Sequence, residues 1–143
     1  MAAGLSWAAA IIHAVVIPAH FREWWLFGVF FVVVAAFQLA WGARAYTRPR
    51  PWLLRGGALV NVAVAAVWVV SRTVGVPAGP EPWEREAVGF IDVMATLDEL
   101  AIAALAWAVV SGRRPPRLPA WAVFYPLAVL SVLGAMLGGG HHH

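Results

Sequence analysis

The sequence predicts an all-α integral membrane protein, folded as a compact bundle of five transmembrane helices. Two features of the composition favour this class. Of the 143 residues, 62% are hydrophobic and 12% are charged, whereas a soluble domain has about 25% charged residues; the mean hydropathy is +0.77. The third observation is that five apolar runs approach the length of about 20 residues that a helix needs to cross the hydrocarbon core. Lipid is therefore the expected solvent for most of the surface.

The apolar runs follow one another with short breaks between them. The first run is the shortest, and the bundle has four spans if this run lies along the surface or re-enters. It lacks the basic residues that precede the apolar core of a secretory signal peptide, so we expect it to be retained. Clusters of Pro and Gly separate the later runs, as is typical of loops. The predicted spans of this single domain, residues 1–137, cover about 3–19, 23–46, 52–74, 87–111 and 119–137.

The charged loops predict an orientation in the membrane. Seven Arg residues lie in or beside the second and fourth connections, and basic loops of this kind stay on the cytoplasmic side. The N-terminus is then cytoplasmic and, with five spans, the C-terminus is outside. All ten basic residues are Arg, with no Lys. This usage, together with the abundance of Ala and Val, is typical of a GC-rich bacterial genome, so we expect a bacterial cytoplasmic membrane.

The same charges limit the expected partners. Because the Arg residues lie in short loops and form no basic face, we expect no nucleic-acid binding. The lipid bilayer is the expected surrounding, and a membrane-protein partner or a second copy of this chain remains open. Cys is absent from the sequence, which excludes disulfides and thiolate metal ligands. The sequence also contains no phosphate-binding loop and no hydrolase motif.

Polar residues recur at helical spacing within the apolar runs, although an ionisable residue inside a membrane is costly. In the fourth run Asp92, Thr96 and Glu99 share one face, whereas Asp98 points about 100° away from Glu99. Such residues normally face the bundle interior or a water-filled cavity. The spacing therefore predicts one polar interior, lined by His13, Gln38, Asn61, Arg72, Asp92, Thr96 and Glu99, with His20 and Glu23 at its entrance.

Estimated depths divide these residues into two layers. With a rise of about 1.5 Å per residue, Gln38 and Glu99 lie about 16–23 Å from the outer ends of their runs. His13 and Asp92 lie about 7–10 Å deep by the same measure. We expect Glu99, placed beside neutral amides, to carry a proton much of the time at neutral pH. We expect Asp92, within reach of Arg72 and His13, to be ionised.

Metal binding is an alternative at the outer layer. Imidazole suits several transition metals, so His13 and Asp92 are candidate metal ligands. His20 lies about 10 Å further along the same helix, too far to bind the same ion unless Pro18 breaks the helix. We expect no haem with two axial His ligands, because these would have to lie on facing helices at one depth. The Gly/His tail, residues 138–143, either captures metal or is the remainder of a purification tag.

Three functions remain open from the sequence. The leading one is a membrane protein with an outward-opening polar site that binds or relays a small cation, proton or small polar ligand, with Glu99 exchanging the proton. The second is a non-catalytic accessory or assembly subunit whose polar layers serve helix packing. The third is a membrane-embedded enzyme that uses Asp92 and Glu99 as an acid–base pair on a lipid-soluble substrate. The absence of recognisable motifs favours a function other than catalysis.

Overall fold

The structure, a computed structural model, describes residues 1–113 and the positions 119, 121, 122, 126 and 129. This part of the chain contains four α-helices and no strand: α1 (Ala2–Glu23), α2 (Trp25–Thr47), α3 (Pro51–Thr73) and α4 (Phe90–Val110). By length and composition, each helix is able to cross a membrane. The predicted class, a helical membrane bundle, is confirmed at this level. The fifth predicted span and the Gly/His tail fall almost entirely outside the described residues.

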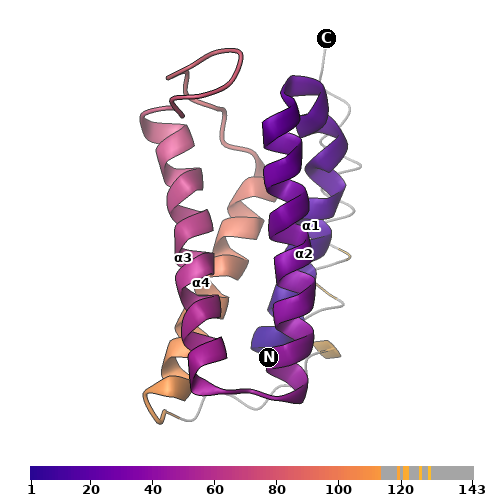
Figure 1. The fold of residues 1–143 in the computed structure, drawn as a ribbon, viewed down its shortest axis with the longest axis vertical. Helices are drawn as coiled ribbons and strands as arrows, with labels where there is room; N and C mark the ends of the chain where they lie inside the picture. The colour runs from indigo at the N-terminus through magenta and orange to yellow at the C-terminus, as the bar shows by residue number, and fades with distance from the viewer. Residues whose placement is uncertain (114–118, 120, 123–125, 127–128, 130–143) are drawn as a thin grey trace.

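The four helices form two antiparallel hairpins that lie beside each other (Figure 1). α1 and α2 turn tightly at Trp24 and pack closely, whereas α3 and α4 are joined by the longer segment 74–89. α1 also packs against α4, but α2 and α3 make few contacts with each other. The bundle is therefore least tightly packed where α2 approaches α3, and residues of both helices line the cavity described below.

Charge divides the two ends of the bundle. The N-terminus, the connection from α2 to α3 and the end of α4 lie at one end, and the α1–α2 turn and segment 74–89 lie at the other (Figure 1). We call the first the basic end, because it carries Arg44, Arg48, Arg50, Arg55 and Arg113. We call the second the acidic end; it carries Glu23, Glu81, Glu84 and Glu86, together with Arg22 and Arg85.

The first helix is longer than the sequence indicated. α1 contains 22 residues and continues through Pro18, so the break that could have brought His13 and His20 together is not present. Proline inside a membrane helix is tolerated because neighbouring groups can satisfy the freed carbonyl. α1 also has the largest buried share of the four helices. It is thus a central element of the bundle and not a surface segment.

An apolar core fills the half of the bundle near the basic end. The aromatic residue of this core is Trp41 on α2, which is 3% exposed. Its Nε1 donates a hydrogen bond of 2.9 Å to the carbonyl oxygen of Leu53. The indole ring fits because Gly57 on α3 has no side chain there. Exposed side chains on the outer faces are mostly apolar, as a lipid-facing surface requires. The buried core consists of Leu5, Ala9, Trp41, Leu54, Ala58, Ile102, Ala103 and Ala106.

Candidate functional site

An amide network joins three helices beside this apolar core. Ser6 on α1, Gln38 on α2 and Asn61 on α3 are fully buried. The Ser6 hydroxyl lies within hydrogen-bonding distance of both the carbonyl and the side-chain oxygen of Gln38. Gln38 Nε2 donates to Asn61 Oδ1, and Asn61 Nδ2 donates to the carbonyl oxygen of Gly57, each over 2.8 Å. The network satisfies its own members, so it holds helices together without needing a ligand.

A buried acid–imidazole pair lies at the middle of the bundle. His13 on α1 and Glu99 on α4 are 3% and 1% exposed, and Nε2 of the imidazole lies 3.0 Å from Oε1 of the carboxyl group. The other ring nitrogen of His13, Nδ1, is buried and has no hydrogen-bond partner within the described part of the chain. The amides, beside which we expected Glu99, bond to each other, and the hydrogen-bond partner of Glu99 is His13.

Arg72 lies in the last turn of α3, near the acidic end of the bundle, and forms ion pairs with two carboxyl groups from other segments. Its Nη2 lies 2.8 Å from Asp92 Oδ2, and its Nη1 lies 2.9 Å from Glu86 Oε2. Nη1 also donates to the Ser71 hydroxyl over 2.6 Å. The guanidinium group lies over the ring of Trp68, 5.6 Å from its centroid. The expected proximity of Arg72 and Asp92 is therefore present, and it ties α3, α4 and the preceding loop together.

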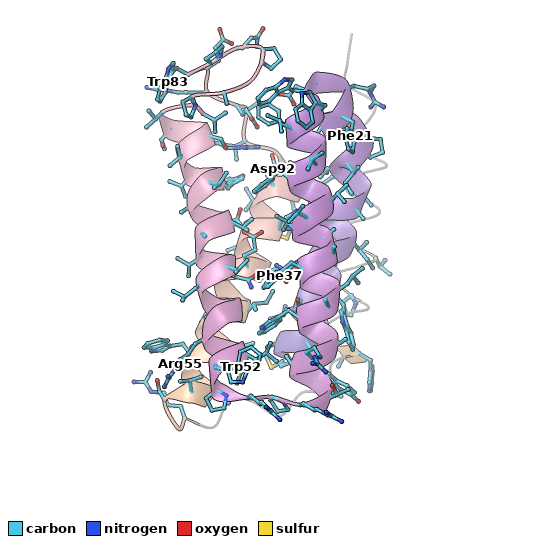
Figure 2. The ribbon with its side chains drawn as sticks, in the orientation of Figure 1. Phe21, Phe37, Trp52, Arg55, Trp83 and Asp92 are labelled. Carbon is cyan, nitrogen blue, oxygen red and sulfur yellow. The ribbon has the colours of Figure 1, made fainter. Side chains whose placement is uncertain are left out.

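Asp92 and Thr96 also have local structural roles. Asp92 Oδ2 accepts a bond of 3.2 Å from the backbone N–H of Gly89, which caps the start of α4. The Thr96 hydroxyl donates to the carbonyl oxygen of Asp92 within the same helix. An acid occupied by a cap and by Arg72 has little freedom to act as a general base. Figure 2 shows Asp92 in the half of the bundle nearer the acidic end.

A cavity of about 220 Å³ lies between the four helices, in the half nearer the acidic end. His13 and Glu99 contribute to its wall at the middle of the bundle, and Arg72 and Asp92 contribute toward the acidic end. Most of the remaining wall is apolar and aromatic. This combination of an apolar wall with a few converging polar groups is the usual form of a small-molecule site. The aromatic residues of the wall are Phe27, Phe30, Phe31 and Trp68.

Phe31 links the cavity to the expected entrance residue His20. Its ring centroid lies 5.6 Å from that of His13 and 4.0 Å from that of His20. His20 Nδ1 lies 2.9 Å from the carbonyl oxygen of Val16, and because a carbonyl only accepts, Nδ1 carries a proton. His20 lines the same cavity, so both predicted His residues border it. They lie about two turns apart on the unbroken helix α1, too far to bind one ion together.

A second cavity, of about 320 Å³, opens at the acidic end under segment 74–89. We call it the vestibule. Four of its lining residues are acidic and one, Arg85, is basic. Phe27, Val76 and Glu86 line both the vestibule and the inner cavity, so the two are neighbours. Glu23, which we expected at the entrance, belongs to the vestibule, and its acidic companions are Glu81, Glu84 and Glu86.

Asp98 stands apart from this arrangement. It is 5% exposed, its Oδ2 has no hydrogen-bond partner within the described residues, and it is absent from the wall of the inner cavity. The predicted divergence of Asp98 from Glu99 around α4 agrees with this placement. Its carboxyl group offers a matched comparison for Glu99, because both are buried acids on the same helix and only Glu99 borders the cavity.

Metal binding gains no support from the described residues. Among them, no group of three or more His, Cys, Asp or Glu side chains is placed to hold an ion. His13 is bonded to Glu99, and Asp92 is bonded to Arg72 and Gly89. The two candidate ligands thus already have other partners.

The structure brings together some predicted residues and separates others. His13, Arg72, Asp92, Thr96 and Glu99 line one cavity, whereas Gln38 and Asn61 lie in the separate amide network. Sequence reasoning missed Glu86, which lies in a loop that reads as a solvated cap. It also missed the aromatic wall, because Phe residues in an apolar run carry no signal of their own. For Trp68 the helical spacing was the available clue, because Trp68 and Arg72 follow Asn61 at i+7 and i+11 and so share one face of the helix.

No protein-family model matches the chain, and no curated protein or solved structure shows significant similarity to it. The function is therefore argued from the site alone.

Proposed function

We propose that this protein binds a small cation or polar ligand in its intramembrane cavity and exchanges a proton with it at the His13–Glu99 pair. The observation that supports this most directly is a buried carboxyl–imidazole pair in the wall of a cavity that has room for a ligand. Ionisable residues inside a membrane are rare and mark ion and substrate pathways or proton relays. In this proposal the vestibule and the acidic end face the outside of a bacterial cytoplasmic membrane, and the basic end faces the cytoplasm.

The pair is suited to hold one mobile proton. A single proton between Nε2 of His13 and Oε1 of Glu99 leaves the pair neutral overall, whichever atom carries it. Its other charged and titratable neighbours are Arg72 on α3, Asp92 and Asp98 on α4, and His20 on α1; the part of α2 within the bundle interior carries none. A neutral pair avoids the cost of an uncompensated charge in a low-dielectric interior. Departure of the proton leaves one negative charge on the pair, which a bound cation then balances.

Infrared spectroscopy tests whether the cavity gives this proton access to solvent. The carboxyl or carboxylate band of Glu99 is identified by its loss in Glu99→Gln and is followed while the bulk pH is changed. We expect the two forms to interconvert in the wild type. Ala95→Phe, which places a ring in the cavity wall beside the pair, should slow or abolish this interconversion while the helix content is kept. A Glu99 band that ignores bulk pH in the folded wild type would contradict the proposal.

A second candidate function is that of an accessory or assembly subunit. The specific observation in its favour is the amide network, where buried polar groups serve helix packing alone. In that case the pair of His13 and Glu99 is a further interhelical contact, of the kind worth about 0.6 kcal/mol on average. A Glu99 band without pH response, together with copurification of one larger membrane complex, would favour this function over the first.

A further inference from the structure

We propose that the ligand of the cavity is a small organic ammonium ion that carries one aromatic or similarly sized apolar group. This inference rests on the proposed function and names the ligand class of the same site. It draws on four features of the described residues: the charge of the wall, the aromatic rings, the volume and the acidic vestibule.

The charge of the wall favours a cation over an anion. Among the described lining residues Arg72 carries the single fixed positive charge, and its guanidinium group is already bonded to the two carboxyl groups of Asp92 and Glu86. Glu99 adds a third carboxyl group deeper in the same wall. An anion would have to compete with the acids for Arg72, whereas an ammonium ion meets a carboxyl group that has no fixed cation beside it. Opposite charge within a few ångströms stabilises both partners.

The aromatic rings provide a second reason. A cation within about 6 Å of a ring centroid is attracted to the face of the ring, most strongly when it has left water. The contact of Arg72 with Trp68 shows that a cation already uses one ring of this wall. The rings of Phe27, Phe30 and Phe31, all on α2, line the rest of the cavity. They suit both an ammonium group and an apolar ring attached to it.

The volume limits the size of the ligand. An engineered apolar cavity of about 150 Å³ holds one benzene molecule. The 220 Å³ available here therefore accommodates one ring and a short ammonium-bearing stem. Sites for drug-sized ligands occupy about 300–1,000 Å³, so larger molecules with several rings exceed this cavity.

The vestibule gives the ligand a way in. Its four acids against one Arg create a negative potential at the acidic end, directly beside the inner cavity. Clefts lined by charges of one sign raise the local concentration of oppositely charged ligands. Glu86 lines both spaces and holds Arg72, so a cation passing inward moves from one carboxyl group to the next.

Binding balances charge by exchange. When the ammonium ion arrives, the proton shared by His13 and Glu99 leaves to the solvent, so that neutral imidazole, carboxylate and ammonium remain. One positive charge enters for each one that departs, and the net charge of the buried site does not change. No further reactant is needed. One proton should therefore be released for each cation bound, wherever the pair is protonated beforehand.

Binding of benzylammonium to the purified full-length chain in lipid nanodiscs tests the ligand class. Benzyl alcohol and benzoate keep the ring and replace the positive charge by none or by a negative one. We expect benzylammonium to bind roughly tenfold or more tightly than either analogue. The reason is that the free energy of a hydrogen bond to a charged group corresponds to more than a tenfold change in the dissociation constant. A pH indicator in weakly buffered solution should record release of a proton. Equal binding of benzyl alcohol or benzoate would overturn the inference.

Two buried acids of one helix provide the matched variants. Glu99→Gln keeps an acceptor for His13. It should abolish proton release and lower the affinity for benzylammonium by roughly tenfold. Asp98→Asn should keep both binding and proton release. If Glu99→Gln fails to fold, Phe27→Leu serves instead. It should lower the affinity for benzylammonium by about two- to fivefold and leave the affinity for benzyl alcohol unchanged. Equal losses in Asp98→Asn and Glu99→Gln, or no loss in Phe27→Leu, would contradict the inference.

Failure of the ligand class can be separated from failure of the proposed function. If the infrared band of Glu99 follows bulk pH through the cavity and benzylammonium has no advantage over its uncharged and anionic analogues, the ligand class is wrong and the proton-exchanging site stands. If the band does not respond and benzylammonium does not bind, both are wrong.

Discussion

Two polar regions of this bundle, the amide network and the cavity cluster of His13, Glu99, Arg72, Asp92 and Glu86, use similar chemistry in different ways. In the amide network each side chain bonds to the next, and its members are wholly enclosed. In the cavity cluster, His13 Nδ1 and Arg72 Nε are buried without a partner among the described residues. The cluster also borders the inner cavity, whereas Ser6, Gln38 and Asn61 are absent from the wall of that cavity.

The difference follows from how the helices approach. Near the basic end the ring of Trp41 fills the space over Gly57, and the neighbouring amides reach one another directly. Toward the acidic end the cavity lies between the helices, and aromatic side chains of α2 form part of its wall. Buried polar groups that are satisfied stabilise a packing, whereas a partly satisfied set beside a cavity is ready to accept a ligand. Variants that affect one region and spare the other test this division.

The largest effect on stability is expected where the ring of Trp41 packs against Gly57. In Gly57→Ala the added methyl group would overlap the buried ring of Trp41 and displace it from its bond to Leu53. Overpacking of this kind costs about 1–3 kcal/mol, which unfolding in mixed detergent micelles, followed by helix content, would measure. The neighbouring change Gly56→Ala meets no atom within 4 Å and should not destabilise the protein. Benzylammonium binding should be kept in both variants, and equal stability of the two would contradict the packing argument.

A smaller loss is expected from opening the amide network. Asn61→Leu removes the acceptor of Gln38 Nε2 and leaves that donor buried without a partner. We expect destabilisation by about 1 kcal/mol, between the cost of an orphaned donor and the small worth of hydrogen bonds between membrane helices. Thr96→Val, in the cavity wall, is the control for this stability measurement. The Thr96 hydroxyl bonds only to a carbonyl oxygen of its own helix, so its removal leaves no side chain of another helix without a partner. If Asn61→Leu weakened benzylammonium binding while stability stayed unchanged, the amide network would belong to the site.

The helices were predictable because the hydropathy and length of an apolar run can be read directly from consecutive residues. Four apolar runs became four helices close to their expected bounds, and the Pro/Gly-rich breaks became connections. The i, i+4 and i+7 spacing also placed Asp92, Thr96 and Glu99 correctly on one side of α4, where they line one cavity. Periodicity within one helix is therefore a good guide to which residues face inward.

The pairing across helices was not predictable in the same way. The estimated depths put His13 with Asp92 and Glu99 with the amides, whereas the structure pairs His13 with Glu99. Relative shift and rotation of packed helices decide such pairs, and α1 extends four residues further than expected at its end. The contribution of Glu86 depends on the path of segment 74–89, which returns so that the backbone N–H of Glu86 donates to the carbonyl oxygen of Ser71. Composition reveals that this loop is acidic but not which of its acids turns inward.

The smallest expected effect comes from the vestibule, and its sign is informative. The double change Glu81→Gln and Glu84→Gln should weaken benzylammonium by about twofold at low ionic strength, since exposed charges act at a distance through screened solvent. Arg85→Gln, in the same vestibule wall, should strengthen binding by a similar factor. Both shifts should vanish at high salt, where the Debye length falls to about 3 Å at 1 M. Binding titrations at two salt concentrations measure this. Shifts of the same sign in both variants would show that the loop acts through its shape, and the acidic vestibule would then have no part in attracting a cation.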